Sequence, residues 1–314
     1  MANLVWLNGN QGVWGYSQID KYEIVSTTAK AGDITLIKAT YDAATHGIST
    51  GHPRTLLVAV KNATFSGDDL IDGTIRSMKW KDAGGNVILK TEGLSYDASK
   101  LVGIDPSQWY DKIFKAKTTF IGSNNSGGTD WDGDDIQTTT GRDIVKAGGG
   151  DDFIKDVKGV DTYYGGAGTD FVAYTWSLAK GGVNVDLAKG TATIGGRTDK
   201  LFSIEGIRGT SKKDILKGNG ADNKFGGLKG NDVIIGGKGE DEVRYHRDDR
   251  YGGSDGIVAN LKKGTVKDGF GTIDTIKGIE RVRGTEKADK FVDNACKDGL
   301  RGEGGNDIFT CGWR

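Results

Sequence analysis

Residues 165–173 read Gly-Gly-Ala-Gly-Thr-Asp-Phe-Val-Ala, a glycine-rich turn that reaches an aspartate at its sixth position and leads into three apolar residues. A Gly-x-Asp sequence recurs upstream at steps of eight or nine residues. Glycine accepts positive φ and allows close backbone approach, so six such residues form a tight turn. The three residues that follow form a short strand with one side chain pointing inward. The aspartates of this first block are Asp135, Asp143, Asp152, Asp161 and Asp170.

The same pattern returns in two later blocks of the chain. Their aspartates are Asp214, Asp222, Asp232 and Asp241 in the second block, and Asp289, Asp298 and Asp307 in the third. Nine of the twelve aspartates have glycine two positions earlier, and the exceptions have Lys212, Lys287 and Cys296 there. An apolar or aromatic residue lies two positions after each aspartate, except at Gln137 and Lys224. A flexible glycine-rich linker would not hold aspartate and apolar residues on one period.

Turn plus strand makes half a coil, so two nine-residue units close one coil of a parallel solenoid. Aspartates 18 residues apart in the sequence then lie on the same edge, in coils about 4.8 Å apart. Carboxylates at that spacing repel each other strongly in a partly buried groove unless a cation lies between them. Carboxylate and carbonyl oxygens, without histidine or thiolate, favour Ca²⁺ over Mg²⁺. The stacked pairs are Asp143/Asp161, Asp152/Asp170, Asp214/Asp232 and Asp289/Asp307.

The nonapeptide G-G-x-G-x-D-x-U-x, in which U is apolar, resembles the calcium-binding repeat of the RTX (repeats-in-toxin) family. The resemblance covers roughly residues 122–314. It implies a calcium-loaded parallel β-roll whose turns hold several Ca²⁺ ions through the twelve aspartates and through turn glycines. It also implies a bacterial protein outside the cell or on its surface, exported by type I secretion. The turn glycines are Gly148, Gly150, Gly166, Gly168, Gly218, Gly220, Gly230, Gly237 and Gly239.

The residues before the repeats, 1–121, lack the Gly-x-Asp pattern and are predicted to form a β-rich globular domain. The predicted fold class is therefore all-β: a β-rich domain over 1–121, followed by a parallel β-roll over 122–314. Within the first domain we expect a helix at 105–115, which Asp105 caps and Pro106 opens. The expected strands are 33–41, 55–60, 73–81 and 85–90, the last two joined by a hairpin turn.

Two longer segments between the repeat blocks, about 175–208 and 246–283, resemble each other. Asp199 matches Asp274, for example, and the offset between the copies grows from 71 to 75 residues. The chain from about residue 165 is therefore a duplicated unit of about 75 residues, each a calcium block plus a β-rich connector. We expect the connectors to continue and cap the roll, because a short roll cannot bury its apolar faces alone.

Two features of the N-terminal domain leave other functions open. Residues 47–51 match G-x-S-x-G, but a strand-like run follows, and the flanking His46 and His52 lie too near to serve as a triad base. A cluster of aromatic residues offers either a sugar-stacking platform or ordinary strand packing. Its members are Trp6, Trp14, Tyr16 and Tyr22. We expect a structural or adhesive calcium-binding protein, not an enzyme; the alternatives are a secreted enzyme and a carbohydrate-binding protein.

Composition limits the partners. The 314 residues carry a net charge of -1, so there is no electrostatic basis for nucleic-acid binding. We see no run of 18 apolar residues and no secretory signal peptide. Cys296 and Cys311 either form a disulfide or stay free thiols. RTX relatives carry a further C-terminal secretion signal; none is visible here, so either the signal is atypical or the chain is a fragment. The expected partners are calcium ions and, as a further candidate, extracellular polysaccharide or a cell surface.

Overall fold

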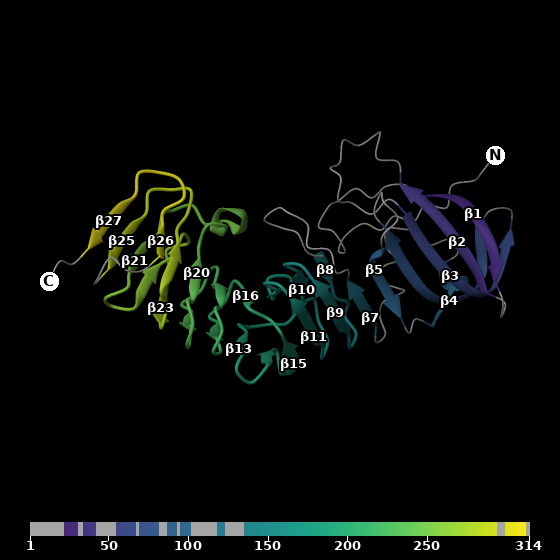
Figure 1. The fold of residues 1–314 in the computed structure, drawn as a ribbon, viewed down its shortest axis with the longest axis horizontal. Helices are drawn as coiled ribbons and strands as arrows, with labels where there is room; N and C mark the ends of the chain where they lie inside the picture. Colours follow the sequence, from purple (N-terminus) through teal and green to yellow (C-terminus); the bar gives the residue numbers. More distant parts are fainter. Residues whose placement is uncertain are drawn as a thin grey trace. The chain divides into compact units, whose positions relative to one another are not determined.

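The computed structural model describes residues 22–30, 34–41, 55–66, 69–81, 87–92, 95–101, 118–122, 135–293 and 299–311. The chain forms two compact units. Unit 1 comprises Met1–Ile154 and Lys158–Gly168, and unit 2 comprises Lys155–Val157 and Thr169–Arg314. The predicted domain boundary near residue 121 stays a prediction. Figure 1 shows the strands of both units.

The N-terminal part of unit 1 is an antiparallel meander of strands. Each strand pairs with the next in sequence order from β1 to β5. Val58 and Val60 of β3 face Met78 and Ile75 of β4, and all four side chains are buried. The four predicted strands are confirmed, and β1 was not predicted. The strands are β1 (Tyr22–Lys30), β2 (Ile34–Tyr41), β3 (Thr55–Ser66), β4 (Asp69–Lys81) and β5 (Val87–Glu92).

The pairing in unit 1 changes from antiparallel to parallel at β7 (Thr119–Gly122). This strand pairs antiparallel with β5 and parallel with β9 (Ile144–Gly149), which in turn pairs parallel with β11 (Thr162–Ala167). The inward side chains Phe120, Val145 and Tyr163 lie in register and are fully buried. The meander therefore ends on the first coils of the roll. Two further short elements are β6 (Tyr96–Asp97) and the 3₁₀ helix η2 (Ala98–Leu101), and β8 (Asp135–Gln137) and β10 (Phe153–Lys155) follow.

Unit 2 contains a parallel ladder in which every strand has three residues and one inward side chain. Its inward side chains are buried in register, and they are Val172, Ile207, Phe225 and Val243, followed by Val282. The predicted β-roll is confirmed by this ladder. Its strands are β12 (Phe171–Ala173), β16 (Gly206–Arg208), β18 (Lys224–Gly226), β20 (Glu242–Arg244), β24 (Arg281–Arg283) and β26 (Gly299–Arg301).

The opposite sides of the same coils form parallel runs interrupted by the connectors. β13 pairs with β17, β17 with β19 and β19 with β23, while β21 pairs with β25 and β25 with β27. The strands are β13 (Asn184–Asp186), β17 (Ile215–Lys217), β19 (Val233–Ile235), β21 (Val258–Asn260), β23 (Ile273–Lys277), β25 (Lys290–Asp293) and β27 (Ile308–Cys311).

Each connector is an antiparallel arm of three strands, as the predicted duplication requires. In the first, β14 (Thr191–Ile194) lies between β13 and β15 (Arg197–Phe202). In the second, β22 (Thr265–Lys267) lies between β21 and β23. The 3₁₀ helix η4 (Asp248–Tyr251) precedes the second arm. The connectors therefore continue the roll.

Several predicted features lie outside the described residues. These are the helix at 105–115, the hairpin turn at 82–85, the G-x-S-x-G sequence at 47–51, Trp6, Trp14, Tyr16 and Cys296. They stay predictions, and so does the disulfide.

Candidate calcium sites at the corners of the roll

The stacked aspartates form a ladder of carboxylates at the corners of the coils. Asp232 Oδ1 accepts the backbone N–H of Asp214 at 2.8 Å, and Asp307 Oδ1 accepts that of Asp289 at 2.9 Å. In unit 1, Asp161 Oδ1 accepts the N–H of Asp143 at 2.7 Å. Each contact joins residues 18 apart, so three of the four predicted pairs are stacked as expected. The fourth pair, Asp152 and Asp170, is divided between the two units, and both side chains are buried.

One carboxylate in each block is satisfied by a threonine four residues earlier. Thr210 donates its N–H to Asp214 Oδ2 at 2.7 Å and its hydroxyl to Oδ1 at 2.9 Å. Thr285 makes the same pair of contacts with Asp289, and Thr139 donates both groups to Asp143 Oδ2.

This threonine cap explains two exceptions to the glycine rule. The Thr210 hydroxyl also accepts the N–H of Lys212 at 3.0 Å, and Thr285 does the same for Lys287 at 3.0 Å. A side-chain hydrogen bond therefore closes these turns in place of a glycine conformation.

Two later corners hold a buried carboxylate oxygen in a different environment. Asp232 Oδ2 and Asp241 Oδ2 have no hydrogen-bond partner among the described residues, and both side chains are at most 1% exposed. A Cβ on Gly227 would lie 2.3 Å from Asp232 Oδ2, and one on Gly236 would lie 2.4 Å from Asp241 Oδ2. A buried charged oxygen without a partner is costly, and a bound cation removes that cost. Carboxylate and backbone carbonyl oxygens are the ligands that Ca²⁺ takes.

The electrostatics of the Asp232 corner also fit a cation. Burial, together with the neighbouring carboxylates of Asp274 and Asp214, raises the pKa of Asp232 to about 9. Burial raises the pKa of Asp214 to about 6 and also raises that of Asp241. A raised carboxyl pKa means that the surroundings disfavour the negative charge. A divalent cation would reverse that preference.

One corner is shifted by a residue relative to the prediction. Asp222 is exposed, and its Oδ1 accepts the N–H of Glu240 at 2.8 Å. The buried corner position belongs to Asn223, whose N–H donates to Asp241 Oδ1 at 2.8 Å. The sequence carried a signal for this assignment, because the buried Phe225 lies two residues after Asn223 and Asp241 lies 18 after it.

The remaining predicted ligands are placed as follows. Asp161 Oδ2 accepts the Tyr163 hydroxyl at 3.0 Å, and Asp307 is half-buried. The side chain of Asp135 and the whole of Asp298 lie outside the described residues. The metal-ligand role of every predicted residue stays a prediction.

At most of the predicted turn glycines, the backbone conformation or a close neighbour leaves no room for a side chain. A Cβ on Gly218 would lie 2.0 Å from the Gly236 carbonyl oxygen, and one on Gly230 would lie 2.6 Å from that of Lys212. Gly220 has neither positive φ nor a close neighbour. Positive φ is found at Gly148, Gly150, Gly166, Gly168, Gly237 and Gly239.

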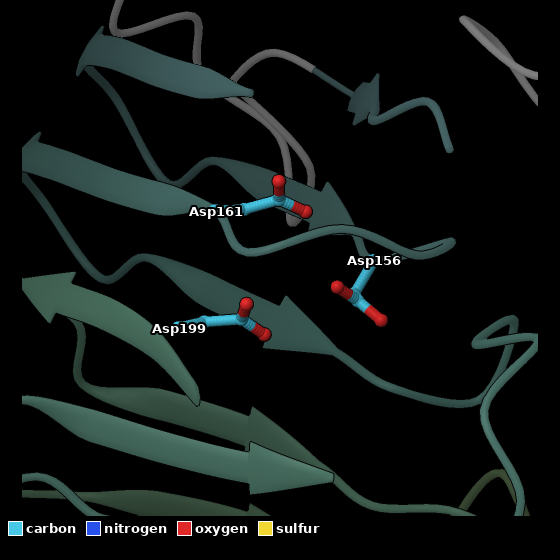
Figure 2. Close-up of side chains that lie close together, drawn as sticks. All are labelled: Asp156, Asp161 and Asp199. Atoms are coloured by element: carbon cyan, nitrogen blue, oxygen red, sulfur yellow. The ribbon is translucent and has the colours of Figure 1, made fainter. Parts of the chain in front are cut away.

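The first connector contains a charged cluster that the repeat pattern did not predict. Arg197 Nη1 donates to Asp199 Oδ2 at 2.6 Å, and Nη2 donates to Asp156 Oδ2 and, at 3.1 Å, to Ser177 Oγ. The Asp156 and Asp199 side chains are fully buried (Figure 2). Asp161, which Figure 2 also labels, belongs to unit 1. A guanidinium of the protein itself therefore bonds to both carboxylates and offsets one of their two negative charges.

The second connector has the same strands without that guanidinium. Tyr245 donates its hydroxyl to Asp274 Oδ2 at 2.9 Å, as Tyr174 donates to Asp199 Oδ2 at 3.4 Å in the first copy. Thr272 takes the sequence position of Arg197, two residues before the aspartate. Burial raises the pKa of Asp274 to about 7.

Fold and corners together define a parallel β-roll with buried carboxylates in its turns. The family model of the RTX calcium-binding nonapeptide repeat matches the chain in four copies, at residues 129–155, 137–172, 208–243 and 269–309. The chain therefore contains RTX calcium-binding nonapeptide repeats. No curated protein matches it. Among the described residues, no helix has the length and apolar character needed to span a membrane.

Proposed function

We propose that Ca²⁺ drives the folding of the roll, and that the protein serves a structural or adhesive role outside the cell. The observation that carries the proposal is the pair of buried, unpartnered oxygens, Asp232 Oδ2 and Asp241 Oδ2. Asp232 lies between two other corner carboxylates of the same ladder, Asp214 and Asp274. Without a counter-charge, burying this ladder opposes folding.

Asp232 and Asp241 would hold the ion, together with backbone carbonyls of the glycine-rich turns beside them. A bound Ca²⁺ would supply the positive charge and the oxygen coordination that these carboxylates lack. Extracellular calcium modules bind with dissociation constants of about 10⁻⁴–10⁻³ M. Sites of that strength would stay empty in the cytosol and fill outside the cell, so the proposed folding would take place after export.

The test is a calcium titration of the full chain, followed by circular dichroism after treatment with chelator. We expect strand signal to appear with calcium, and we expect Asp232→Asn to raise the calcium midpoint by about tenfold. Asp222→Asn is the matched control, because that aspartate is exposed and lies outside the ladder. A spectrum that calcium leaves unchanged would refute the folding proposal. Equal midpoints for the two variants would refute the site.

We also propose that the protein is not an enzyme. The serine motif at 47–51 is followed by a proline and then by β3, and not by the helix that a nucleophile elbow needs. An esterase and polysaccharide-cleavage screen of the wild type and Ser49→Ala tests this. Turnover by the wild type that the variant loses would establish the enzyme alternative.

A further inference from the structure

Glu280 has the position in its coil that an aspartate has in the repeats. Gly278 lies two residues before it and the buried Val282 two residues after it, which is the Gly-x-Asp pattern with glutamate in place of aspartate. Val282 of β24 is in register with Val243 of β20, so the coil of Glu280 stacks directly on the coil of Asp241. The sequence period obscured this corner, because the second connector separates the two coils and Glu280 follows Asp241 by 39 residues.

Two hydrogen bonds hold Glu280 against the Asp241 corner. The Asp241 N–H donates to Glu280 Oε2 at 3.0 Å, and the Glu280 N–H donates to the Asp241 carbonyl oxygen at 3.1 Å. The first of these is the contact that Asp232 Oδ1 makes with the N–H of Asp214. Glu280 therefore takes the place of a repeat aspartate in the ladder, one coil after Asp241.

The first connector has the same arrangement at Glu205. The Asp170 N–H donates to Glu205 Oε2 at 3.0 Å, and the Glu205 N–H donates to the Asp170 carbonyl oxygen at 3.1 Å. Ser203 and Gly278 lie two residues before the two glutamates, and their φ angles are 49° and 61°. Positive φ is uncommon for a residue other than glycine, so both copies keep a specific turn before the glutamate.

The Asp241 carboxylate has an oxygen that receives no hydrogen bond. Its side chain is fully buried, and Oδ2 has no hydrogen-bond partner among the described residues. A Cβ on Gly236 would lie 1.9 Å from the Gly278 carbonyl oxygen and 2.4 Å from Asp241 Oδ2. Two oxygens this close to one point are near enough together for a single Ca²⁺ to contact both, since the ion lies about 2.3–2.6 Å from each ligand oxygen.

The charges around this oxygen also favour a cation. Burial, followed by the carboxylates of Glu280 and Asp222, raises the pKa of Asp241. The adjacent Arg281 pairs instead with Glu240: its Nη1 lies 3.7 Å from Glu240 Oε2, and both side chains are more than half exposed. A bound divalent ion would supply the positive charge that the corner lacks.

We propose that Asp241 Oδ2, the Glu280 carboxylate and the Gly278 carbonyl oxygen hold one Ca²⁺ between the repeat coil and the coil that follows the second connector. Carboxylate and carbonyl oxygens are the ligands of this ion, and glutamate can bind it through both of its oxygens. Calcium then fastens the end of the second connector to the coil from which the connector departs. The inference rests on the proposed calcium-driven folding and adds to it ligands that lie outside the Gly-x-Asp pattern.

The test is a calcium titration of the full chain, read by amide hydrogen exchange over residues 277–283. We expect Glu280→Gln to raise the calcium midpoint for protection of this segment by about tenfold. Glutamine keeps an oxygen that can accept the Asp241 N–H, so a purely structural role of Glu280 predicts no shift. Glu240→Gln is the matched control, because it removes the same charge beside Asp241 from an exposed side chain, and it should shift the midpoint by less than about twofold.

Equal midpoints for the two variants would overturn the inference. If Glu280→Gln gains no protection at any calcium concentration, Glu280→Asp is compared with Glu240→Asp by the same criterion, because the shorter side chain keeps the charge and loses the reach. The wild type separates the two proposals. If calcium protects no segment of the wild-type roll, the folding proposal fails; if it protects the roll and the variant midpoints are equal, only the role of Glu280 fails.

Discussion

The two connectors share their strands and their buried Tyr–Asp hydrogen bond, but they treat buried negative charge differently. In the first, Arg197 bonds to both Asp156 and Asp199. In the second, Thr272 replaces the arginine, and its hydroxyl and N–H donate to Asp268. Burial raises the pKa of Asp268, and burial with the carboxylates of Asp268 and Asp274 raises that of Asp248 to about 8.

This difference extends to the corner beside each connector. Five residues before Asp161 the chain has Asp156, whereas five residues before Asp232 it has Gly227. Asp156 is hydrogen-bonded to Arg197, whereas Gly227 lies directly against the Asp232 carboxylate. The two copies of the duplicated unit thus differ: in the first connector a guanidinium of the protein bonds to the buried aspartates, and in the second a threonine takes its position.

The largest expected effect comes from removing the internal cation. Arg197→Met should destabilise unit 2 by about 3–5 kcal/mol, because it leaves two buried carboxylates without their partner. Urea unfolding in saturating calcium measures this, with Arg197→Lys as the control that keeps the charge. If Arg197→Met unfolds at the same urea concentration as the wild type, the guanidinium does not stabilise the first connector.

Calcium removal should affect the two connectors unequally. With limiting chelator, amide exchange over 246–283 should accelerate by about a hundredfold more than over 175–208, because Arg197 bonds to the buried aspartates of the first connector and Thr272 takes its position in the second. Hydrogen exchange with mass spectrometry reads both segments in one sample. Equal acceleration in the two segments would show that the arginine does not distinguish them.

The second connector should also depend on pH once calcium is removed. The pKa of Asp248 is raised to about 8 in the fold, so the protonated form favours folding. Its contribution is fully present below the unfolded pKa of about 4 and is lost as pH rises toward 8. We expect unit 2 in chelator to lose about 1–3 kcal/mol of stability between pH 5 and pH 8. Asp248→Asn should reduce this slope without abolishing it, because Asp214, Asp232 and Asp274 also have raised pKa values. A slope of opposite sign would contradict the explanation.

The smallest effect should come from a substitution at Asn223, where an amide occupies the corner position that a carboxylate takes in other coils. Asn223 Nδ2 lies 3.4 Å from the Glu205 carbonyl oxygen, which a carboxylate would repel. Asn223→Asp should therefore destabilise the chain by about 1 kcal/mol in chelator and less in calcium. Thermal unfolding with and without calcium tests this, and Asp222→Asn serves as the exposed neighbour. A loss of stability that calcium does not reduce would argue against an ion at this corner.

Much of the architecture was predictable because the repeat is local. A turn of six residues and a strand of three close a coil wherever they recur, so the roll, its 18-residue stacking and the duplicated connectors followed from spacing alone. The caps were harder to predict. Thr210 and Thr285 donate hydrogen bonds to Asp214 and Asp289, two carboxylates that the repeat pattern had assigned to metal. In the sequence, the only sign of these caps is that lysine replaces glycine two residues before each aspartate.

The sequence by itself determined that acidic corners and short strands alternate, because aspartate and apolar residues recur along the chain with a period of about nine residues. The tertiary structure decided which acidic group each corner receives. The buried Phe225 follows Asn223 by two residues, and Asn223 is buried with it whereas Asp222 is exposed, so the corner falls one residue later than the Gly-x-Asp pattern places it. The tertiary structure also decided which buried carboxylates receive a guanidinium of the protein, because Arg197 and Asp156 lie 41 residues apart and only the folded coil brings them into contact.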